Sequence, residues 1–73
     1  MGKKDVGKPK AFLRARSPED RERIIAITER IVAGQIASGA FDPDDEAAFR
    51  KAVRRAAADA HAAYYAAVEF IGG

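Results

Sequence analysis

Two long stretches of the chain place apolar residues at helical spacing. In residues 18–38 apolar side chains recur every three or four positions, and in residues 43–71 they recur mainly every seven. Such spacing lines one face of an α-helix. We therefore predict one helix over residues 18–38 and a second over residues 43–71, about 31 and 43 Å long at 1.5 Å per residue.

Both predicted helices begin and end with residues that are typical of helix termini. The stretches SPED (residues 17–20) and DPDD (residues 42–45) each supply a side-chain acceptor, a proline for the first helical position and carboxylates for the first turn. Gly39 and Gly72 stand where left-handed caps end helices. The connection between the helices is short, which predicts an antiparallel hairpin.

The two apolar faces differ in character. In the first helix, Ile24, Ile27 and Ile31 form a stripe that Gly34 continues, and we expect Gly34 to lie against an alanine of the second helix. The second helix carries a narrow, alanine-rich seam with heptad spacing and an aromatic residue at each end. The seam consists of Phe49, Val53, Ala56, Ala60, Ala63, Ala67 and Phe70.

The first helix has a second apolar stripe, formed by Ile25, Val32 and Ile36. It is rotated by roughly 100–120° from the first stripe, at about 100° per residue. One partner helix cannot cover both stripes, and a chain of this size has a small core. We therefore predict an all-α fold that assembles into a multi-helix homo-oligomer through this second stripe. Packing of the stripe on the N-terminal segment is the alternative.

Residues 10–16 alternate between basic or aromatic and small or apolar side chains. Period two would place Lys10, Arg14 and Arg16 on one face of a strand and Leu13 on the other. Residues 1–16 hold six basic residues against one acidic residue, whereas residues 17–73 hold seven against ten. A polyanion is therefore a candidate partner. Residues 1–16 are a basic arm or include a short strand over residues 10–16, and residues 17–73 form the hairpin.

A strand followed by a capped helix and a second helix is the order of elements in ribbon-helix-helix DNA-binding proteins. The stretch from Gln35 to Ala56, with QIASG at residues 35–39, Phe41 and then Glu46, resembles the ParD-like antitoxins of this fold. The resemblance covers about a third of the chain. It implies a dimer, DNA binding through the N-terminal strand, and a toxin partner held by the C-terminal half.

A second candidate site lies on the second helix. Arg50, Arg54, His61 and Tyr65 fall within about 60° of arc at helical spacing, a line that suits phosphate or an acidic protein face. An ordinary solvated face is the competing interpretation, since Glu46 precedes Arg50 by four residues, the favourable order for a helix ion pair.

Several function classes find no support in the sequence. The chain has no cysteine and one histidine, so we expect no metal site and no cofactor. It lacks paired catalytic carboxylates, a glycine-rich phosphate loop and a nucleophile with an orienting base, so we expect no enzyme. No apolar run is long enough to cross a membrane and no signal peptide is visible, which predicts a cytoplasmic protein.

These observations lead to two hypotheses. The first is a small, non-enzymatic DNA-binding regulator, antitoxin-like, that acts as a homo-oligomer and contacts DNA through Lys10, Arg14 and Arg16. The alternative is a small helical inhibitor or adaptor that binds another protein, by analogy of size and shape with phage- or plasmid-type inhibitors such as anti-CRISPR proteins. In that case the contact is either the acidic body of the chain or the line formed by Arg50, Arg54, His61 and Tyr65, and the basic arm is dispensable.

Overall fold

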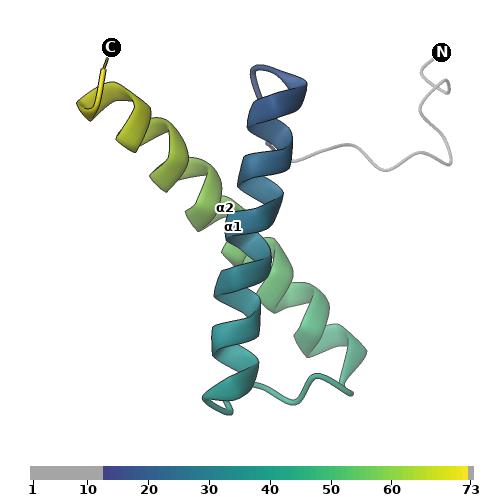
Figure 1. Cartoon of the computed structure of the whole chain (residues 1–73). Coiled ribbons are helices and arrows are strands. Elements are labelled where there is room, and N and C mark those ends of the chain that lie inside the picture. Colours follow the sequence, from purple (N-terminus) through teal and green to yellow (C-terminus); the bar gives the residue numbers. More distant parts are fainter. Residues whose placement is uncertain (1–12, 73) are drawn as a thin grey trace, which may run out of the picture.

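The computed structural model describes residues 13–72 as two helices, α1 (Pro18–Ala37) and α2 (Glu46–Phe70). They form an antiparallel hairpin (Figure 1), which confirms the predicted all-α architecture. No strand occurs within the described residues. The predicted strand is therefore wrong for residues 13–16, whereas residues 10–12, with Lys10, lie outside the described part of the chain.

Helix α1 begins and ends as its sequence predicts. The Ser17 hydroxyl accepts a hydrogen bond from the backbone N–H of Asp20 at 3.0 Å, and Pro18 occupies the first helical position. At the other end, Gly39 has a φ of 78°, and its N–H bonds to the carbonyl of Ile36 while that of Ala40 bonds to Gln35. This pair of bonds is a Schellman motif, which glycine permits because it adopts positive φ without strain.

Helix α2 begins three residues later than predicted. The Asp42 carboxylate accepts from the N–H of Asp44 at 2.9 Å, and its backbone carbonyl accepts from the N–H of Asp45 at 3.0 Å. The Asp-Pro pair therefore builds a turn, a role that aspartate and proline fill as readily as a helix start. The helix is capped instead by Asp45, whose side chain accepts from Ala48 N–H at 3.1 Å.

The two helices cross obliquely near their middles (Figure 1), in a molecule with principal extents of 41 × 41 × 15 Å. The buried residues of α1 are Ile24, Thr28 and Val32, a row spaced by four, and Ala56 and Ala60 form the matching row on α2. Rows with this spacing pack at a steep angle, whereas heptad seams pack almost parallel. Both alanines are fully buried, and their small side chains let the helix backbones approach.

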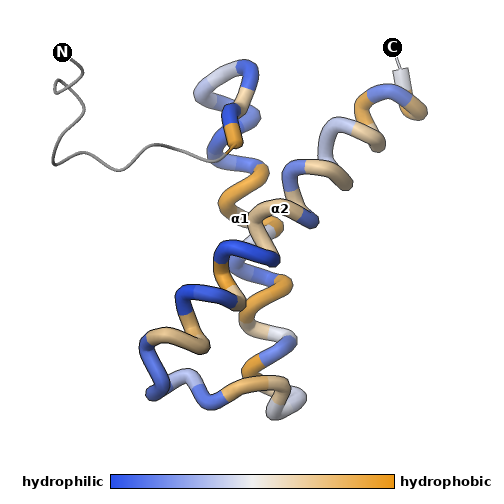
Figure 2. The backbone as a smooth tube through the Cα atoms, turned by 180° about the vertical axis from the view of Figure 1, so that it is seen from behind, coloured by the Kyte–Doolittle hydropathy of each residue, from blue (hydrophilic) through white to orange (hydrophobic). Residues whose placement is uncertain are grey.

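The oblique crossing overturns part of the predicted packing. The C-terminal half of the α2 seam diverges from α1, so that Ala63, Ala67 and Phe70 are exposed and Tyr64 and Tyr65 pack inward. Figure 2 shows hydrophobic stretches where the helices cross and again at the C-terminal end of α2.

The expected contact of Gly34 with a helix α2 alanine is also wrong, since a Cβ atom placed on Gly34 would meet nothing within 4 Å. The core that results is small. It is centred on Ile24, Ala60 and Tyr65, with Ala15, Ile27, Ile31 and Tyr64 packed against it.

Candidate functional site

Residues 13–16, called the basic segment below, are bound to α2 by side chains rather than paired in a sheet. The backbone N–H of Arg16 donates to the Tyr65 hydroxyl at 2.7 Å, and His61 Nε2 donates to the carbonyl oxygen of Arg14 at 2.9 Å. The guanidinium of Arg16 lies over the Tyr65 ring, 4.2 Å from its centroid, a favourable cation–π contact. Within the described residues, the basic segment is therefore docked on the hairpin.

The same tyrosine takes part in a polar cluster with Asp20. One carboxylate oxygen of Asp20 accepts from Tyr64 Oη at 2.7 Å, and the other accepts from Tyr65 Oη at 2.9 Å. The two tyrosine rings meet edge to face at 5.1 Å, and the His61 ring meets Tyr65 similarly at 5.0 Å. We call Arg16, Asp20, Tyr64 and Tyr65 the clasp, since they join the start of α1 and the basic segment to α2.

The clasp selects the ionised form of Asp20. The hydrogen bond from Tyr64 lowers the pKa of Asp20 below its usual 3.8; partial desolvation opposes this effect, and the bonds from Tyr65 and Ser17 add to it. The same bond raises the pKa of Tyr64 above 10.0, since losing its proton would place two anions together. The clasp is therefore held together by a carboxylate that accepts from neutral hydroxyl donors.

The predicted partner-binding line on α2 is only partly exposed. Tyr65 is buried and His61 is half-buried beneath the basic segment, while the partner-binding role of the line stays a prediction. Arg50 and Arg54 are exposed; Arg50 lies 3.8 Å from Glu46, which makes the predicted helix ion pair. The four residues differ in exposure because, in the C-terminal half of α2, Tyr64 and Tyr65 face inward in place of the predicted heptad seam.

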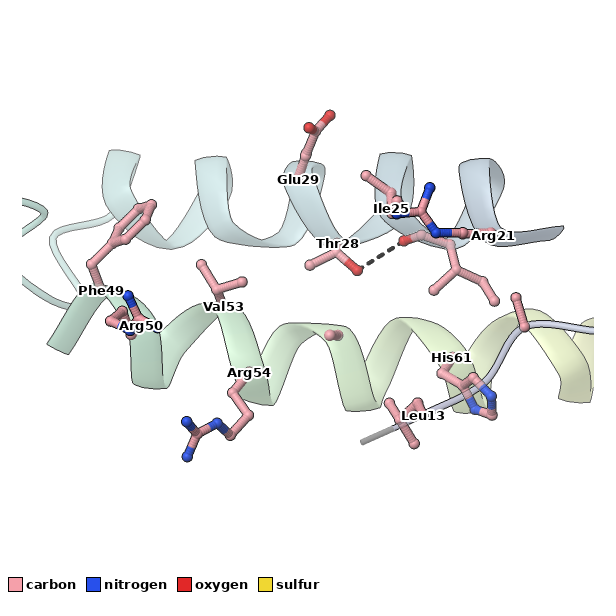
Figure 3. Close-up of a pocket in the computed structure, with 13 residues that line it drawn as sticks. Leu13, Arg21, Ile25, Thr28, Glu29, Phe49, Arg50, Val53, Arg54 and His61 are labelled. Atoms are coloured by element: carbon pink, nitrogen blue, oxygen red, sulfur yellow. Dashed lines mark hydrogen bonds between the residues drawn. The ribbon is translucent and has the colours of Figure 1, made fainter. Parts of the chain in front are cut away.

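A groove of about 660 Å³ runs between the helices beside the basic segment, and we call it the interhelical groove. Figure 3 shows Phe49 and Val53 reaching from α2 toward α1, with Leu13 near His61 at the other end. Its lining is mainly apolar, and arginines stand along its rim. The apolar lining residues are Leu13, Ala15, Ile24, Ile25, Phe49, Val53 and Ala57, and the arginines are Arg21, Arg50 and Arg54.

The predicted oligomer interface divides between core and groove. Val32 is buried within the hairpin of one chain, so it offers little surface to a second copy, and the predicted interface stays a prediction. Ile25 is 40 % exposed and Ile36 is 37 % exposed. Ile25 lines the groove together with Leu13, and Ile36 lines a smaller adjoining hollow that shares Phe49 with it. The apolar surface left open is thus a continuous groove rather than a helix stripe.

Sequence reasoning missed two members of the clasp. Asp20 looks like an ordinary first-turn carboxylate, and its interaction with Tyr64 spans 44 residues, which no helical period reveals. The available signal was chemical, because a buried tyrosine hydroxyl needs a hydrogen-bond partner. Two adjacent tyrosines near the single histidine of the chain therefore indicate that a carboxylate from elsewhere in the sequence is their hydrogen-bond partner.

Comparisons with known proteins add no assignment: no family model matches the chain, and no curated protein and no solved structure gives a significant match. The resemblance of residues 35–56 to the ParD-like antitoxins stays a prediction. Within residues 13–72, no group of three or more histidine, cysteine, aspartate or glutamate residues is placed to hold a metal ion. In the same part of the chain, neither helix has the length and apolar character that crossing a membrane requires.

Proposed function

We propose that the protein is a small, non-enzymatic DNA-binding regulator that acts as a homo-oligomer and contacts the DNA backbone through Arg14 and Arg16. The observation that carries this proposal is the docking of the basic segment on α2. Lys10 belongs to the same predicted set but lies outside the described residues.

Docking matters because it holds cations in place before DNA arrives. Arg14 and Arg16 are both exposed, while the backbone between them is bonded to His61 and Tyr65. A free arm loses conformational entropy when it binds, whereas a segment that is already ordered loses less. The rim of the interhelical groove adds Arg21 and Arg50. Arg14 and Arg16 do not line this groove. Exposed arginines suit phosphate contacts, which position a protein on DNA without reading its sequence.

The test is fluorescence anisotropy of a labelled mixed-sequence duplex at about 50 and 200 mM salt. We expect affinity to fall steeply with salt, and we expect Arg14→Ala to lower the slope of log K against log salt by about 0.9, the value for one lost phosphate contact. Arg30→Ala is the matched control, because it removes the same charge from an exposed position of α1 outside the groove. Absence of binding at the lower salt concentration contradicts the proposal.

A second variant separates charge from position. Tyr65→Phe keeps every cation but removes the hydroxyl that accepts from Arg16 N–H. If fixed placement is what helps, affinity falls while the salt slope stays that of the wild type. Equal affinity in Tyr65→Phe and wild type, with helicity preserved by circular dichroism, contradicts the role given to docking.

Binding of another protein is the second candidate function, and the interhelical groove is the observation that favours it. An apolar groove with exposed Ile25 and Phe49 is a typical acceptor for an amphipathic helix. Arginines on its rim favour an acidic partner. Absence of DNA binding at both salt concentrations, together with an activity that requires an intact groove, would support the protein-binding function.

A further inference from the structure

Two large apolar surfaces stay open in the described chain. One is the interhelical groove. The other is the C-terminal tip of α2, where Val68, Phe70 and Ile71 are 49, 88 and 73 % exposed. We call these three residues the tip. Figure 1 shows the last turns of α2 projecting away from α1, so nothing in the described hairpin covers them. Exposed apolar clusters of this kind mark interaction sites.

We propose that the tip of one chain fills the interhelical groove of a second copy, and that the exchange is reciprocal. This inference rests on the homo-oligomer named in the proposed function and assigns its interface. It replaces the predicted stripe, since Val32 is buried, and retains Ile25, which lines the groove.

The tip cannot reach the groove of its own chain. His61 is the last residue of α2 that lines the groove, and Phe70 follows nine positions later in the same helix, about 13 Å further along its axis at 1.5 Å per residue. A continuous helix does not fold back over that distance. Any tip in the groove must therefore come from another molecule.

Charge is complementary between the two surfaces. Glu69 lies between residues of the tip, and the last turn of α2 has no basic residue. The exposed carbonyls of a helix C-terminus add partial negative charge. The groove is lined by Arg21, Arg50 and Arg54 and by Glu29, and Glu46 beside it pairs with Arg50, so the arginines outnumber the carboxylates there. An acidic apolar tip entering a basic apolar groove brings opposite charges together at the rim, where they favour this pairing over others.

Size is compatible with a specific contact. A covered phenylalanine buries roughly 150–250 Å². A twofold axis repeats every contact, because the same surface of each chain meets its counterpart. Two tips with their groove walls therefore bury area on the order of 1,000 Å², which is where specific interfaces begin.

The test is sedimentation of four proteins over a dilution series. We expect the wild type to be a dimer, and Phe70→Asp and Ile25→Asp to be monomers with unchanged helicity. Ala58→Asp is the matched control, since it adds the same charge at an exposed position of α2 outside tip and groove, and it should stay dimeric. Phe70 is so exposed that its substitution leaves the hairpin intact.

Mixing the two monomeric variants gives the decisive result. Ile25→Asp keeps a normal tip and Phe70→Asp keeps a normal groove, so the mixture retains one of two contacts. We expect it to form a heterodimer, weaker than the wild-type dimer, that neither variant forms alone. A mixture that associates no more than its components overturns the inference, and so does a dimeric Phe70→Asp.

The outcomes also separate this inference from the proposed function. A wild type that is monomeric throughout refutes both the tip contact and the homo-oligomer, and leaves the groove to residues 1–12 of the same chain or to a different protein. If Phe70→Asp is still a dimer, the tip contact alone is refuted. Salt-dependent DNA binding, measured independently, decides whether the basic segment contacts phosphate.

Discussion

Ile24 and Ile25 are neighbours in the sequence that the fold places in different surroundings. Ile24 is 8 % exposed at the centre of the core, whereas Ile25 is 40 % exposed on the groove wall. Changing each to alanine removes the same atoms from both sites. The difference in unfolding free energy between the two variants therefore reports how much burial at the helix crossing stabilises the hairpin.

Ile24→Ala should be severely destabilising. It removes about three buried methyl or methylene groups, roughly 2.4 kcal/mol at about 0.8 kcal/mol each. The cavity left behind brings the usual loss to about 2–5 kcal/mol. A domain of about 60 residues has a total stability of roughly 3–9 kcal/mol. One kcal/mol lowers the melting temperature by about 4–8 °C in a domain this small, so we expect a decrease of at least about 10 °C.

The assay is urea and thermal unfolding followed by far-ultraviolet circular dichroism. Both variants are made in the Phe70→Asp background, so that self-association affects neither. Ile25→Ala should then lose less than about 1 kcal/mol, because much of its side chain is already in water. Equal losses in the two variants, or a loss below about 1 kcal/mol for Ile24→Ala, would refute the packing described for α1.

Two further predictions concern the clasp and the crossing. Because the clasp lowers the pKa of Asp20, its contribution to the stability of the hairpin is fully present above pH 3.8 and is lost as the pH falls through the lowered pKa. Urea midpoints measured at a series of acidic pH values should therefore fall more steeply in wild type than in Asp20→Asn. Parallel curves for the two proteins would contradict this. Ala60→Leu inserts bulk where the helices touch and should cost about 1–3 kcal/mol in chemical unfolding, whereas Ala58→Leu, on the exposed side of α2, should change stability by less than about 0.5 kcal/mol.

The helices and their hairpin arrangement were predictable because their signals are local. The SPED stretch caps α1 and Gly39 ends it, each through contacts within a few residues. The start of α2 was misplaced by the same logic, since Asp42 and Pro43 favour a turn as much as a helix start. Local chemistry allowed both structures, and Asp45 provides the cap that the helix uses.

The angle between the helices was not predictable from the heptad spacing in α2. The repeat of Phe49, Ala56, Ala63 and Phe70 favours almost parallel packing, but the contact follows the four-residue rows through Ala56 and Ala60. Alanine allows this packing, because its small side chain lets two helices approach closely at many crossing angles. Once the crossing is oblique, Phe70 is left in water and Tyr65 turns inward, which the sequence pattern did not show.

The candidate site was predictable in its residue types and not in its geometry. Arg14 and Arg16 were identified by alternation, yet they lie on a segment that α2 binds through His61 and Tyr65. The strand interpretation failed for residues 13–16 because a period of two shows only that opposite faces differ. It does not show whether the backbone will bond to another strand or to side chains of a helix.

The clasp should also affect the rates at which the hairpin folds and unfolds. Its bond from Arg16 to Tyr65 joins residues 49 positions apart, whereas helix and turn contacts are local. Closing a loop of that length costs roughly 3 kcal/mol of chain entropy. Helices form within about a microsecond, so we expect the clasp to close after them. Weakening it should speed unfolding and leave the folding rate nearly unchanged. The clasp then determines the lifetime of the folded hairpin by slowing its unfolding.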